Sequence, residues 1–387
     1  MASRCFTLPA SLTVPPSCLT DPQHGTHSFI KLKDVKIHYV EAGDKNKPLM
    51  LFVHGFPEFW YSWRHQMKEF RQTHWVVAID LRGYGDSDKP MGKSAYETGI
   101  LVEDLRQIIC GLGKESCVLV AHDWGGALAW RLTIEYPDLV DKLVVMNCPH
   151  PTAFKLHIRN SYMFAFQLPY VPEKFLRLED LSIIEKLFDQ VRDMSAFTEE
   201  DVEAYKYTFN KPDAFTPPLN YYRNILITNS SSTNKSKKKT IKDKIFDVPV
   251  LLIWGDADIA LHSKMAELSS RYVENCTVKM IPKASHWVQQ DAIHAVNDYM
   301  SDFLLDYSKP RRLVRRMRSM RRQLVSSVSG VMRWTGMISE TNPTRHAPNS
   351  GHLVATLGKR MVVSTFNIVH RMSGAPLTGL QNIAVVI

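Results

Sequence analysis

The sequence has no apolar run of about 18 residues, the length that a helix needs to cross a membrane. Cysteines are few, six in 387 residues, and none forms a CxxC pair. Neither a disulfide scaffold nor a cysteine-rich metal site is therefore indicated, and reduced thiols are expected. The first 25 residues lack an apolar signal core, because Pro9, Pro15 and Pro16 interrupt them. No internal repeat is evident.

Acidic residues are almost absent from the C-terminal end. From Lys309 onward there are thirteen Lys and Arg and one acid, Glu340, a charge of +12. Since the whole chain carries +9, residues 1–308 carry −3. Apolar residues recur among the arginines at steps of three and four: Leu313, Met317, Met320, Leu324, Val328 and Val331. This pattern is typical of a basic amphipathic helix on an anionic membrane surface, with an unstructured extension as the alternative. A nucleic-acid partner is not expected, because no recognition motif accompanies the charge.

Short apolar segments alternate with amphipathic stretches through most of the chain. We predict strands over residues 29–33, 35–41, 49–53, 75–79, 117–120, 143–146, 250–254 and 278–281. Helices are predicted over 60–70, 100–112, 263–272 and 292–305, with a further one from about Gly126. Strands that are apolar throughout and separated by helices indicate a parallel sheet covered on both faces. The predicted fold class is α/β, with a mostly parallel central sheet that opens on a hairpin.

One region breaks this alternation, since residues 150–246 contain helical patches and many aromatics but no convincing strand. We therefore predict a helical cap over 150–246, inserted into a core formed by 27–149 and 247–308. Residues 1–26 would form an N-terminal extension and 309–387 the basic tail. Within the cap, residues 229–244 are polar and Lys-rich and are expected to form an exposed loop.

The segment 118–126, Val-Leu-Val-Ala-His-Asp-Trp-Gly-Gly, has the form of a nucleophile elbow, a tight turn from a buried strand into a helix. Its central position holds Asp123 where serine hydrolases have serine, so ordinary serine esterase activity is disfavoured. A carboxylate is anionic near neutral pH and can attack a saturated carbon directly. The product would be an alkyl ester of Asp123, which water must then hydrolyse.

Hydrolysis of such an ester needs a base that activates water and an acid that orients the base. Asp258 follows the strand at 250–254 and His286 follows the strand at 278–281. The chain order is then nucleophile, acid, histidine, as this type of fold requires. Asp256 is the competitor for the acid role.

An oxyanion hole is also expected near the elbow. The loop His54-Gly-Phe-Pro57 follows a predicted strand and suits backbone donation, with the N–H groups of Phe56 and Trp124 as the donors. His54 and His122 are expected to brace the loops rather than to react. No cofactor or metal is expected.

Five motifs together resemble the epoxide hydrolase family of α/β-hydrolases: His54-Gly-Phe-Pro-Glu58, Trp60-Tyr-Ser-Trp63, Asp80-Leu-Arg-Gly-Tyr-Gly85, His122-Asp-Trp-Gly-Gly126 and Ala284-Ser-His-Trp-Val-Gln-Gln290. The resemblance covers about residues 22–306 and points to the animal epoxide hydrolase 3 and 4 type. It implies an α/β-hydrolase fold with an inserted helical cap. It also implies that a carboxylate opens an epoxide, giving a vicinal diol after hydrolysis.

The resemblance further implies two cap tyrosines that donate hydrogen bonds to the epoxide oxygen, at the positions of Tyr162 and Tyr222. Acid assistance is needed because an alkoxide is a poor leaving group, and a phenol can supply it. The other cap tyrosines, among them Tyr221, are expected to be packing residues. The segment 151–160 is shorter than the family pattern, which puts the placement of Tyr162 in question.

Two other functions stay open. A haloalkane dehalogenase also uses an aspartate followed by Trp, although the paired tyrosines argue against it. A member with a damaged cap could act without catalysis, as a binding protein at a membrane surface. The aromatic-rich cap favours an apolar substrate such as a fatty-acid epoxide. By resemblance the protein is expected at the endoplasmic reticulum or another membrane surface, and in the cytoplasm if the tail binds no membrane.

Overall fold

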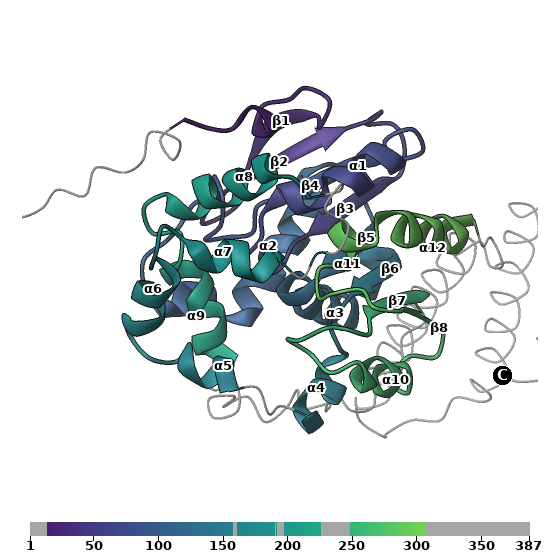
Figure 1. Cartoon of the computed structure of the whole chain (residues 1–387). Helices are drawn as coiled ribbons and strands as arrows, with labels where there is room; N and C mark the ends of the chain where they lie inside the picture. The colour runs from purple at the N-terminus through teal and green to yellow at the C-terminus, as the bar shows by residue number, and fades with distance from the viewer. Residues whose placement is uncertain (1–13, 158–160, 190, 192–196, 226–247, 306–387) are drawn as a thin grey trace, which may run out of the picture. The chain divides into compact units, whose positions relative to one another are not determined.

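The computed structural model describes residues 14–157, 161–189, 191, 197–225 and 248–305, without the side chains of 155–157, 161 and 162. An eight-stranded sheet lies at the centre, in the order β1-β2-β4-β3-β5-β6-β7-β8 (Figure 1). Its strands are β1 (Thr26–Lys31), β2 (Lys36–Ala42), β3 (Leu49–Val53), β4 (Trp75–Ile79), β5 (Cys117–His122), β6 (Val140–Met146), β7 (Val250–Gly255) and β8 (Cys276–Ile281). β2 pairs antiparallel with β1 and with β4, and the other neighbours are parallel. The expected hairpin and mostly parallel sheet are both present.

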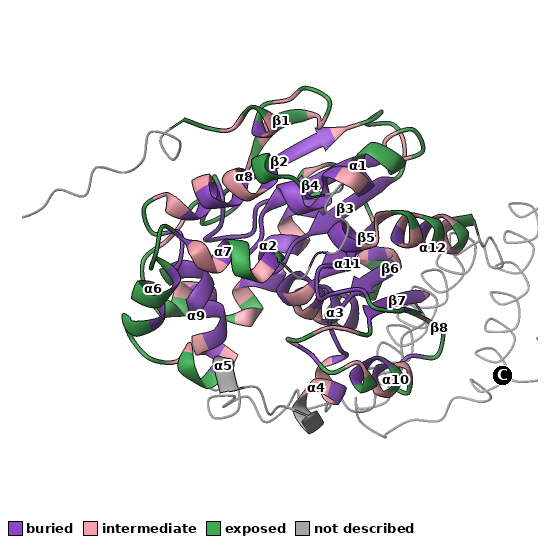
Figure 2. Ribbon diagram, in the orientation of Figure 1, coloured by how far each residue is buried: buried purple, intermediate pink, exposed green. Residues whose placement is uncertain are grey.

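The central strands are buried along their whole length. Every residue of β3, β4, β5 and β7 is buried, and Figure 2 shows these strands enclosed between helices. A parallel strand packed on both faces needs apolar side chains at successive positions, so its sequence reads as an unbroken apolar run. This is why these strands could be predicted almost to the residue.

Helices cover both faces of the sheet. α1 (Arg64–Phe70) and α12 (Ile293–Leu305) pack together on one face, with the short α11 (Val288–Asp291) beside them. α2 (Thr98–Gly111), α3 (Asp123–Glu135) and α10 (Lys264–Ser270) cover the other face (Figure 1). The helix expected over 60–70 is divided into a 3-10 turn, Trp60–Trp63, and α1. α3 begins at Asp123, earlier than the expected Gly126.

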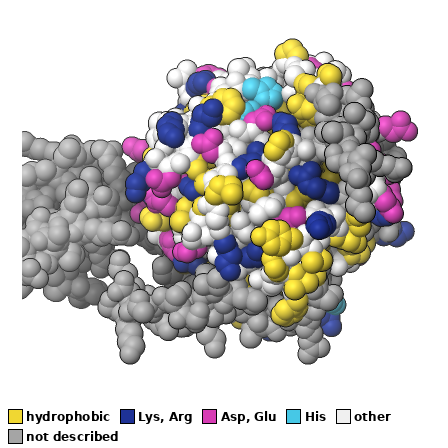
Figure 3. Space-filling view, turned by 90° about the vertical axis from the view of Figure 1, so that its left-hand side faces the viewer, with side chains coloured by type: hydrophobic (Ala, Val, Ile, Leu, Met, Phe, Trp, Pro, Cys, Tyr) yellow, Lys and Arg dark blue, Asp and Glu magenta, His cyan; other side chains and the backbone are white. Residues whose placement is uncertain are grey.

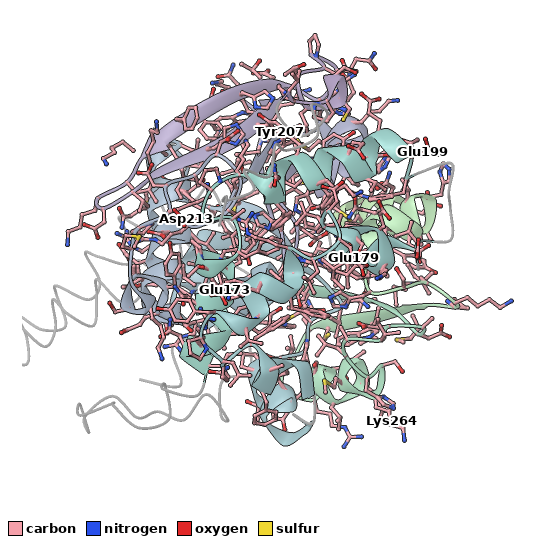
Figure 4. The ribbon with its side chains drawn as sticks, turned by 60° about the vertical axis from the view of Figure 1, so that its left-hand side comes forward. Glu173, Glu179, Glu199, Tyr207, Asp213 and Lys264 are labelled. Atoms are coloured by element: carbon pink, nitrogen blue, oxygen red, sulfur yellow. The ribbon has the colours of Figure 1, made fainter. Side chains whose placement is uncertain are left out.

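Between β6 and β7 the described residues form helices and no strand, as expected. These inserted helices are α4 (Pro151–His157), α5 (Ser161–Ala165), α6 (Val171–Leu176), α7 (Ser182–Phe188), α8 (Glu199–Asn210) and α9 (Thr216–Ile225). Figure 4 shows Glu199 and Tyr207 along α8. α8 starts with a capping box, in which Thr198 Oγ1 accepts from Asp201 N at 3.3 Å and Asp201 Oδ2 accepts from Thr198 N at 2.6 Å. The domain boundaries stay predictions.

The surface of the inserted helices is mixed. Figure 3 faces this side and shows apolar side chains interspersed with Lys, Arg, Asp and Glu. The exposed apolar residues here are Phe164, Leu168, Tyr170, Val171, Phe175 and Leu178. In the described part of the chain, no helix combines the length and apolarity needed to cross a membrane. The predicted loop at 229–244 and the predicted tail at 309–387 lie outside the described residues.

Candidate active site

The loops that follow β3, β5, β7 and β8 meet at the carboxyl edge of the sheet. β5 lies directly beside β3, with Ala121 opposite Val53, so the elbow after β5 faces the loop after β3. The carboxyl edge is where ligands bind in open α/β sheets. This arrangement brings Phe56, Asp123, Asp258 and His286 together, four of the residues that the sequence nominates.

The backbone turns sharply at Asp123. His122 is extended, with φ of −129°, and Asp123 has φ of 46°, in the left-handed region that non-glycine residues rarely adopt. Only glycine fits at two positions that pack closely against this turn, Gly55 and Gly125. A Cβ on Gly55 would lie 2.4 Å from Cβ of Asp123, and one on Gly125 would lie 2.2 Å from the carbonyl oxygen of Val53. The glycines of the two motifs are thus required by the close approach of the two loops.

The Asp123 carboxylate has a partner at each oxygen. Phe56 N–H donates to Oδ1 at 3.0 Å, and His286 Nε2 lies 3.5 Å from Oδ2. Burial by itself raises the pKa of Asp123, but the nearby His286 outweighs it, and the net effect lowers the pKa. Asp123 is therefore ionised at neutral pH. Trp124, the second expected oxyanion donor, is the next residue of α3.

Asp258 holds the other side of His286. Its Oδ2 lies 2.8 Å from His286 Nδ1, and its Oδ1 accepts from the N–H groups of Ala260 at 2.7 Å and Leu261 at 2.9 Å. Burial lowers the pKa of His286, but the charges of Asp258 and Asp123 dominate and raise it to about 10.

Asp256 has a different partner, since its Oδ1 accepts from Lys283 N at 2.5 Å. The geometry therefore favours Asp258 over Asp256 as the residue that orients His286.

Sequence reasoning missed Asn147, the residue that follows β6. Its Nδ2 donates to Asp258 Oδ2 at 2.7 Å and its Oδ1 accepts from Gly255 N at 3.3 Å. Its φ of 43° is left-handed, a conformation that Asn tolerates better than most residues. The sequence shows only a polar residue directly after an apolar strand, and the pairing of that strand with β7 becomes visible in the structure.

Glu58 is a second such residue, quoted within a motif but given no role. It is fully buried, and its Oε2 accepts from Gly55 N at 2.9 Å and lies 2.6 Å from His122 Nδ1. Its Oε1 accepts from the side-chain amides of Gln289 at 2.8 Å and Gln290 at 3.3 Å. Glu58 thereby ties the loop after β3 to the elbow and to α11.

The two histidines at this edge, His122 and His54, have different hydrogen-bond partners. His122 Nδ1 faces the Glu58 carboxylate and its Nε2 faces the carbonyl oxygen of His286 at 2.9 Å. Both ring nitrogens of His122 therefore face hydrogen-bond acceptors. His54 instead donates from Nδ1 to Gly55 O at 2.8 Å and accepts at Nε2 from Leu81 N at 3.0 Å, which makes it neutral. These contacts fit the expected bracing role of both residues.

Tyr222 of α9 lies over the elbow. Its ring centroid is 5.0 Å from that of Trp124, 5.5 Å from that of Phe56 and 5.0 Å from that of Phe166, all in edge-to-face geometry. Tyr222 is thus packed on the rings of both expected oxyanion donors. Tyr162 falls in α5, and its side chain lies outside the described part of the structure.

A metal site was not expected. Within the described residues, no group of three or more His, Cys, Asp and Glu side chains is arranged to hold a metal ion. The absence of a cofactor stays a prediction.

Comparison with known proteins gives the family. Residues 48–292 match the model of the alpha/beta hydrolase fold family. Epoxide hydrolase 4 from Homo sapiens is 40% identical over 313 residues, covering 77% of this chain and 84% of the relative. Epoxide hydrolase 3 from Xenopus tropicalis is 43% identical over 305 residues, covering 75% of this chain and 80% of the relative.

Solved structures agree with this result. An epoxide hydrolase from Bacillus megaterium in complex with an inhibitor is 36% identical, with a TM-score of 0.65, and the match covers 72% of this chain and 99% of that chain. An epoxide hydrolase from Vigna radiata is 28% identical, with a TM-score of 0.65, and the match covers 74% of this chain and 99% of that chain. The predicted resemblance is confirmed, and the chain belongs to the epoxide hydrolase family of α/β-hydrolases.

Proposed function

We propose that this protein opens a lipophilic epoxide to a vicinal diol through an ester of Asp123, which His286-activated water then hydrolyses. The names of its relatives support the reaction class. The observation that carries the proposal is a carboxylate at the elbow, bonded to Phe56 N–H and facing His286. A carboxylate at this position favours attack at a saturated carbon, because it needs no base to become a nucleophile.

Ring opening is the first step. Phe56 N–H holds Asp123 Oδ1, and an Asp123 oxygen attacks a ring carbon as the bond between that carbon and the ring oxygen breaks. The ring oxygen takes a proton from a phenol, for which Tyr222 is the described candidate and Tyr162 the second expected donor. Proton donation is what distinguishes this reaction from halide displacement, since a halide leaves without a proton.

Ester hydrolysis is the second step. Esterification removes the charge of Asp123, so His286 keeps only one of its two carboxylate neighbours and its pKa falls from about 10. The neutral imidazole then takes a proton from water while the water oxygen attacks the ester carbonyl carbon. Phe56 N–H and Trp124 N–H would bind the resulting oxyanion, and Asp258 stabilises the imidazolium. Collapse of this intermediate breaks the bond between the carbonyl carbon and the substrate oxygen, and that oxygen leaves with the remaining proton of the water as the diol's second hydroxyl. Asp123 is then again a carboxylate and His286 an imidazolium. The proton that His286 gave up after esterification has restored the phenolate to the phenol.

The lining of the site suits an apolar substrate. The rings of Phe56, Trp124, Phe166 and Tyr222 contact one another beside the carboxylate. Aromatic walls with few polar groups bind apolar ligands by removing their surface from water. A role in lipid turnover and a membrane contact through the basic tail are further expectations, and neither is needed for the reaction.

The test uses the full chain with styrene oxide, a long-chain fatty-acid epoxide and a 1-chloroalkane of similar size. We expect diol from the epoxides and no chloride release. With His286→Gln, mass spectrometry should find an adduct of the epoxide's mass on the peptide that contains Asp123, and Asp123→Asn should abolish it. Chloride release without diol would identify a dehalogenase. If neither the two epoxides nor the chloroalkane forms an adduct, the protein is a non-catalytic binding protein.

A further inference from the structure

Two tyrosines stand side by side on α9 and point to different parts of the protein. Successive residues of a helix are rotated by about 100°, so the side chains of Tyr221 and Tyr222 leave α9 in different directions. Tyr222 packs on Phe56 and Phe166 at the candidate site. Tyr221 is buried against the loop that follows β4, where its hydroxyl donates to the carbonyl oxygen of Arg82 at 2.7 Å.

The acceptor of this bond is held rigidly. Arg82 forms a two-pronged ion pair with Asp104 of α2, with Nε at 2.6 Å from Oδ2 and Nη2 at 2.8 Å from Oδ1, and both side chains are buried. A fork-shaped guanidinium bound to both carboxylate oxygens has little freedom to move. The carbonyl oxygen of Arg82 is thus a fixed point of the core to which α9 is attached.

Aromatic packing links the ring of Tyr221 to the elbow. Its ring lies edge-on to Tyr84 at 5.4 Å and to Trp124 at 5.5 Å, between ring centroids. Trp124 in turn contacts Tyr222 at 5.0 Å. The indole of Trp124 therefore contacts both tyrosines, so a shift of the Tyr221 ring would also displace the Tyr222 ring.

α9 has a second attachment on the same face. Asn224, one turn after Tyr221, donates from Nδ2 to Lys93 O at 2.8 Å. The N-terminal end of α9 also packs closely, since a Cβ on Gly83 would lie 2.7 Å from Cβ of Pro217. Loss of the Tyr221 hydroxyl alone would therefore leave α9 docked, but without the bond nearest to Tyr222.

From this geometry we infer that Tyr221 is a positioning residue, whose bond to Arg82 O fixes the rotation of α9 so that the Tyr222 phenol faces the ring oxygen of the epoxide. The inference rests on the proposed function, because it assigns Tyr221 a purpose only if Tyr222 is a proton donor. A small misplacement of a proton donor slows the chemical step strongly even when substrate still binds.

The experiment is a double-mutant cycle between Tyr221→Phe and Tyr222→Phe, both in a His286→Gln background where the Asp123 ester accumulates. Ester formation from styrene oxide is followed by mass spectrometry over time. Tyr221→Phe should slow it by about 10-fold or more. In the Tyr222→Phe background the same change should have no further effect, because two residues that act as one unit are not additive.

Tyr96→Phe is the matched control. Tyr96 is a buried tyrosine of the same aromatic cluster, and its hydroxyl also donates to a backbone carbonyl, that of Pro90 at 2.7 Å, but it is not on α9. It should leave ester formation within about twofold of the parent, as expected for a hydroxyl that does not attach α9 to the core. Thermal unfolding of each variant reports whether the fold is kept. If Tyr221→Phe does not fold, Asn224→Ala replaces it in the cycle, with the same expectation.

The outcomes separate this inference from the proposed function. Absence of any ester in the parent overturns the proposed function and the inference with it. Ester formation that needs Tyr222 but not Tyr221 overturns the inference alone. Equal slowing by Tyr221→Phe with and without Tyr222 also overturns it, because the effect would then be general. Slowing that disappears without Tyr222 supports it.

Discussion

His286 lies closer to Asp258 than to Asp123. Its Nδ1 is 2.8 Å from Asp258 Oδ2, whereas its Nε2 is 3.5 Å from Asp123 Oδ2. The short contact fixes the imidazole, and the longer one is weaker than a good hydrogen bond. Nε2 is therefore free to turn to a water molecule once Asp123 has become an ester. The two carboxylates have different tasks although both raise the pKa of the same histidine.

The two half-reactions should depend on pH in different ways. Ring opening needs ionised Asp123, whose pKa is lowered from its usual 3.8, and a phenol that keeps its proton. Its rate should therefore change little between about pH 5 and about pH 9. Hydrolysis needs neutral His286, whose pKa in the ester falls below the value of about 10 in the free enzyme. The hydrolysis rate should then rise with pH and level off well below pH 10. Stopped-flow tryptophan fluorescence can follow both steps. A hydrolysis rate independent of pH would contradict the role of His286.

Replacing Asp258 by Asn should lower kcat by about 10³-fold or more, because the imidazole loses both its orientation and its charge partner. The reduction should appear mainly in hydrolysis of the ester. Asp256→Asn is the control, since Asp256 bonds to Lys283 N and not to His286. Steady-state diol formation by the two variants distinguishes them. An equal loss of diol formation in both variants would mean that catalysis depends on the loop as a whole and not on the Asp258 carboxylate.

Sequence alone predicted the elements that depend on strong local patterns. The buried strands are apolar throughout, and β3, with Leu49 to Val53, was expected with the limits that the structure gives. The start of α3 was misjudged, because a left-handed φ at Asp123 places the first helical residue at the turn itself. The motif predicted a tight turn here, but not the close approach of Asp123 to Gly55, which lies far away in the sequence.

The roles of Asn147 and Glu58 could not be predicted for a similar reason. Each acts through partners from other strands, Asn147 through Asp258 and Glu58 through His122. The order of strands in the sheet decides these pairings, and the sequence reveals that order only through the fold. The preference for Asp258 over Asp256, by contrast, came from its motif, and the contact with His286 supports it.

Glu58→Gln should destabilise the protein by about 3 kcal/mol, because the buried groups that contact the carboxylate, among them the His122 ring and the Gly55 N–H, would lose a charged partner. Burial by itself raises the pKa of Glu58, but His122 and the Gly55 N–H outweigh it and hold the pKa below its usual 4.5. A lowered pKa means that the charge stabilises the fold above pH 4.5 and that this stability is lost as pH falls through the folded value.

The difference in unfolding free energy between Glu58→Gln and the parent should therefore be largest near neutral pH and shrink below 4.5. Urea denaturation across this range measures it. Glu135→Gln removes a surface pair with Arg131 and should change stability by less than about 1 kcal/mol at every pH. A constant difference for Glu58→Gln across the range would indicate a loss of packing rather than of charge.

Gly125→Ala should be among the most damaging small substitutions in the chain. The added methyl would lie 2.2 Å from Val53 O and 2.5 Å from His54 O, both backbone atoms that cannot move without disturbing β3 and the loop that carries Phe56. We expect a loss of about 3 kcal/mol in stability or more, as for overpacking in a rigid site. Gly99→Ala in α2 is the control, since nothing lies within 4 Å of its added Cβ. It should stabilise the protein by up to about 1 kcal/mol through helix propensity. Thermal unfolding measures the change in stability of both variants. If Gly125→Ala left stability unchanged, the two loops would lie farther apart in solution than the geometry of the elbow requires.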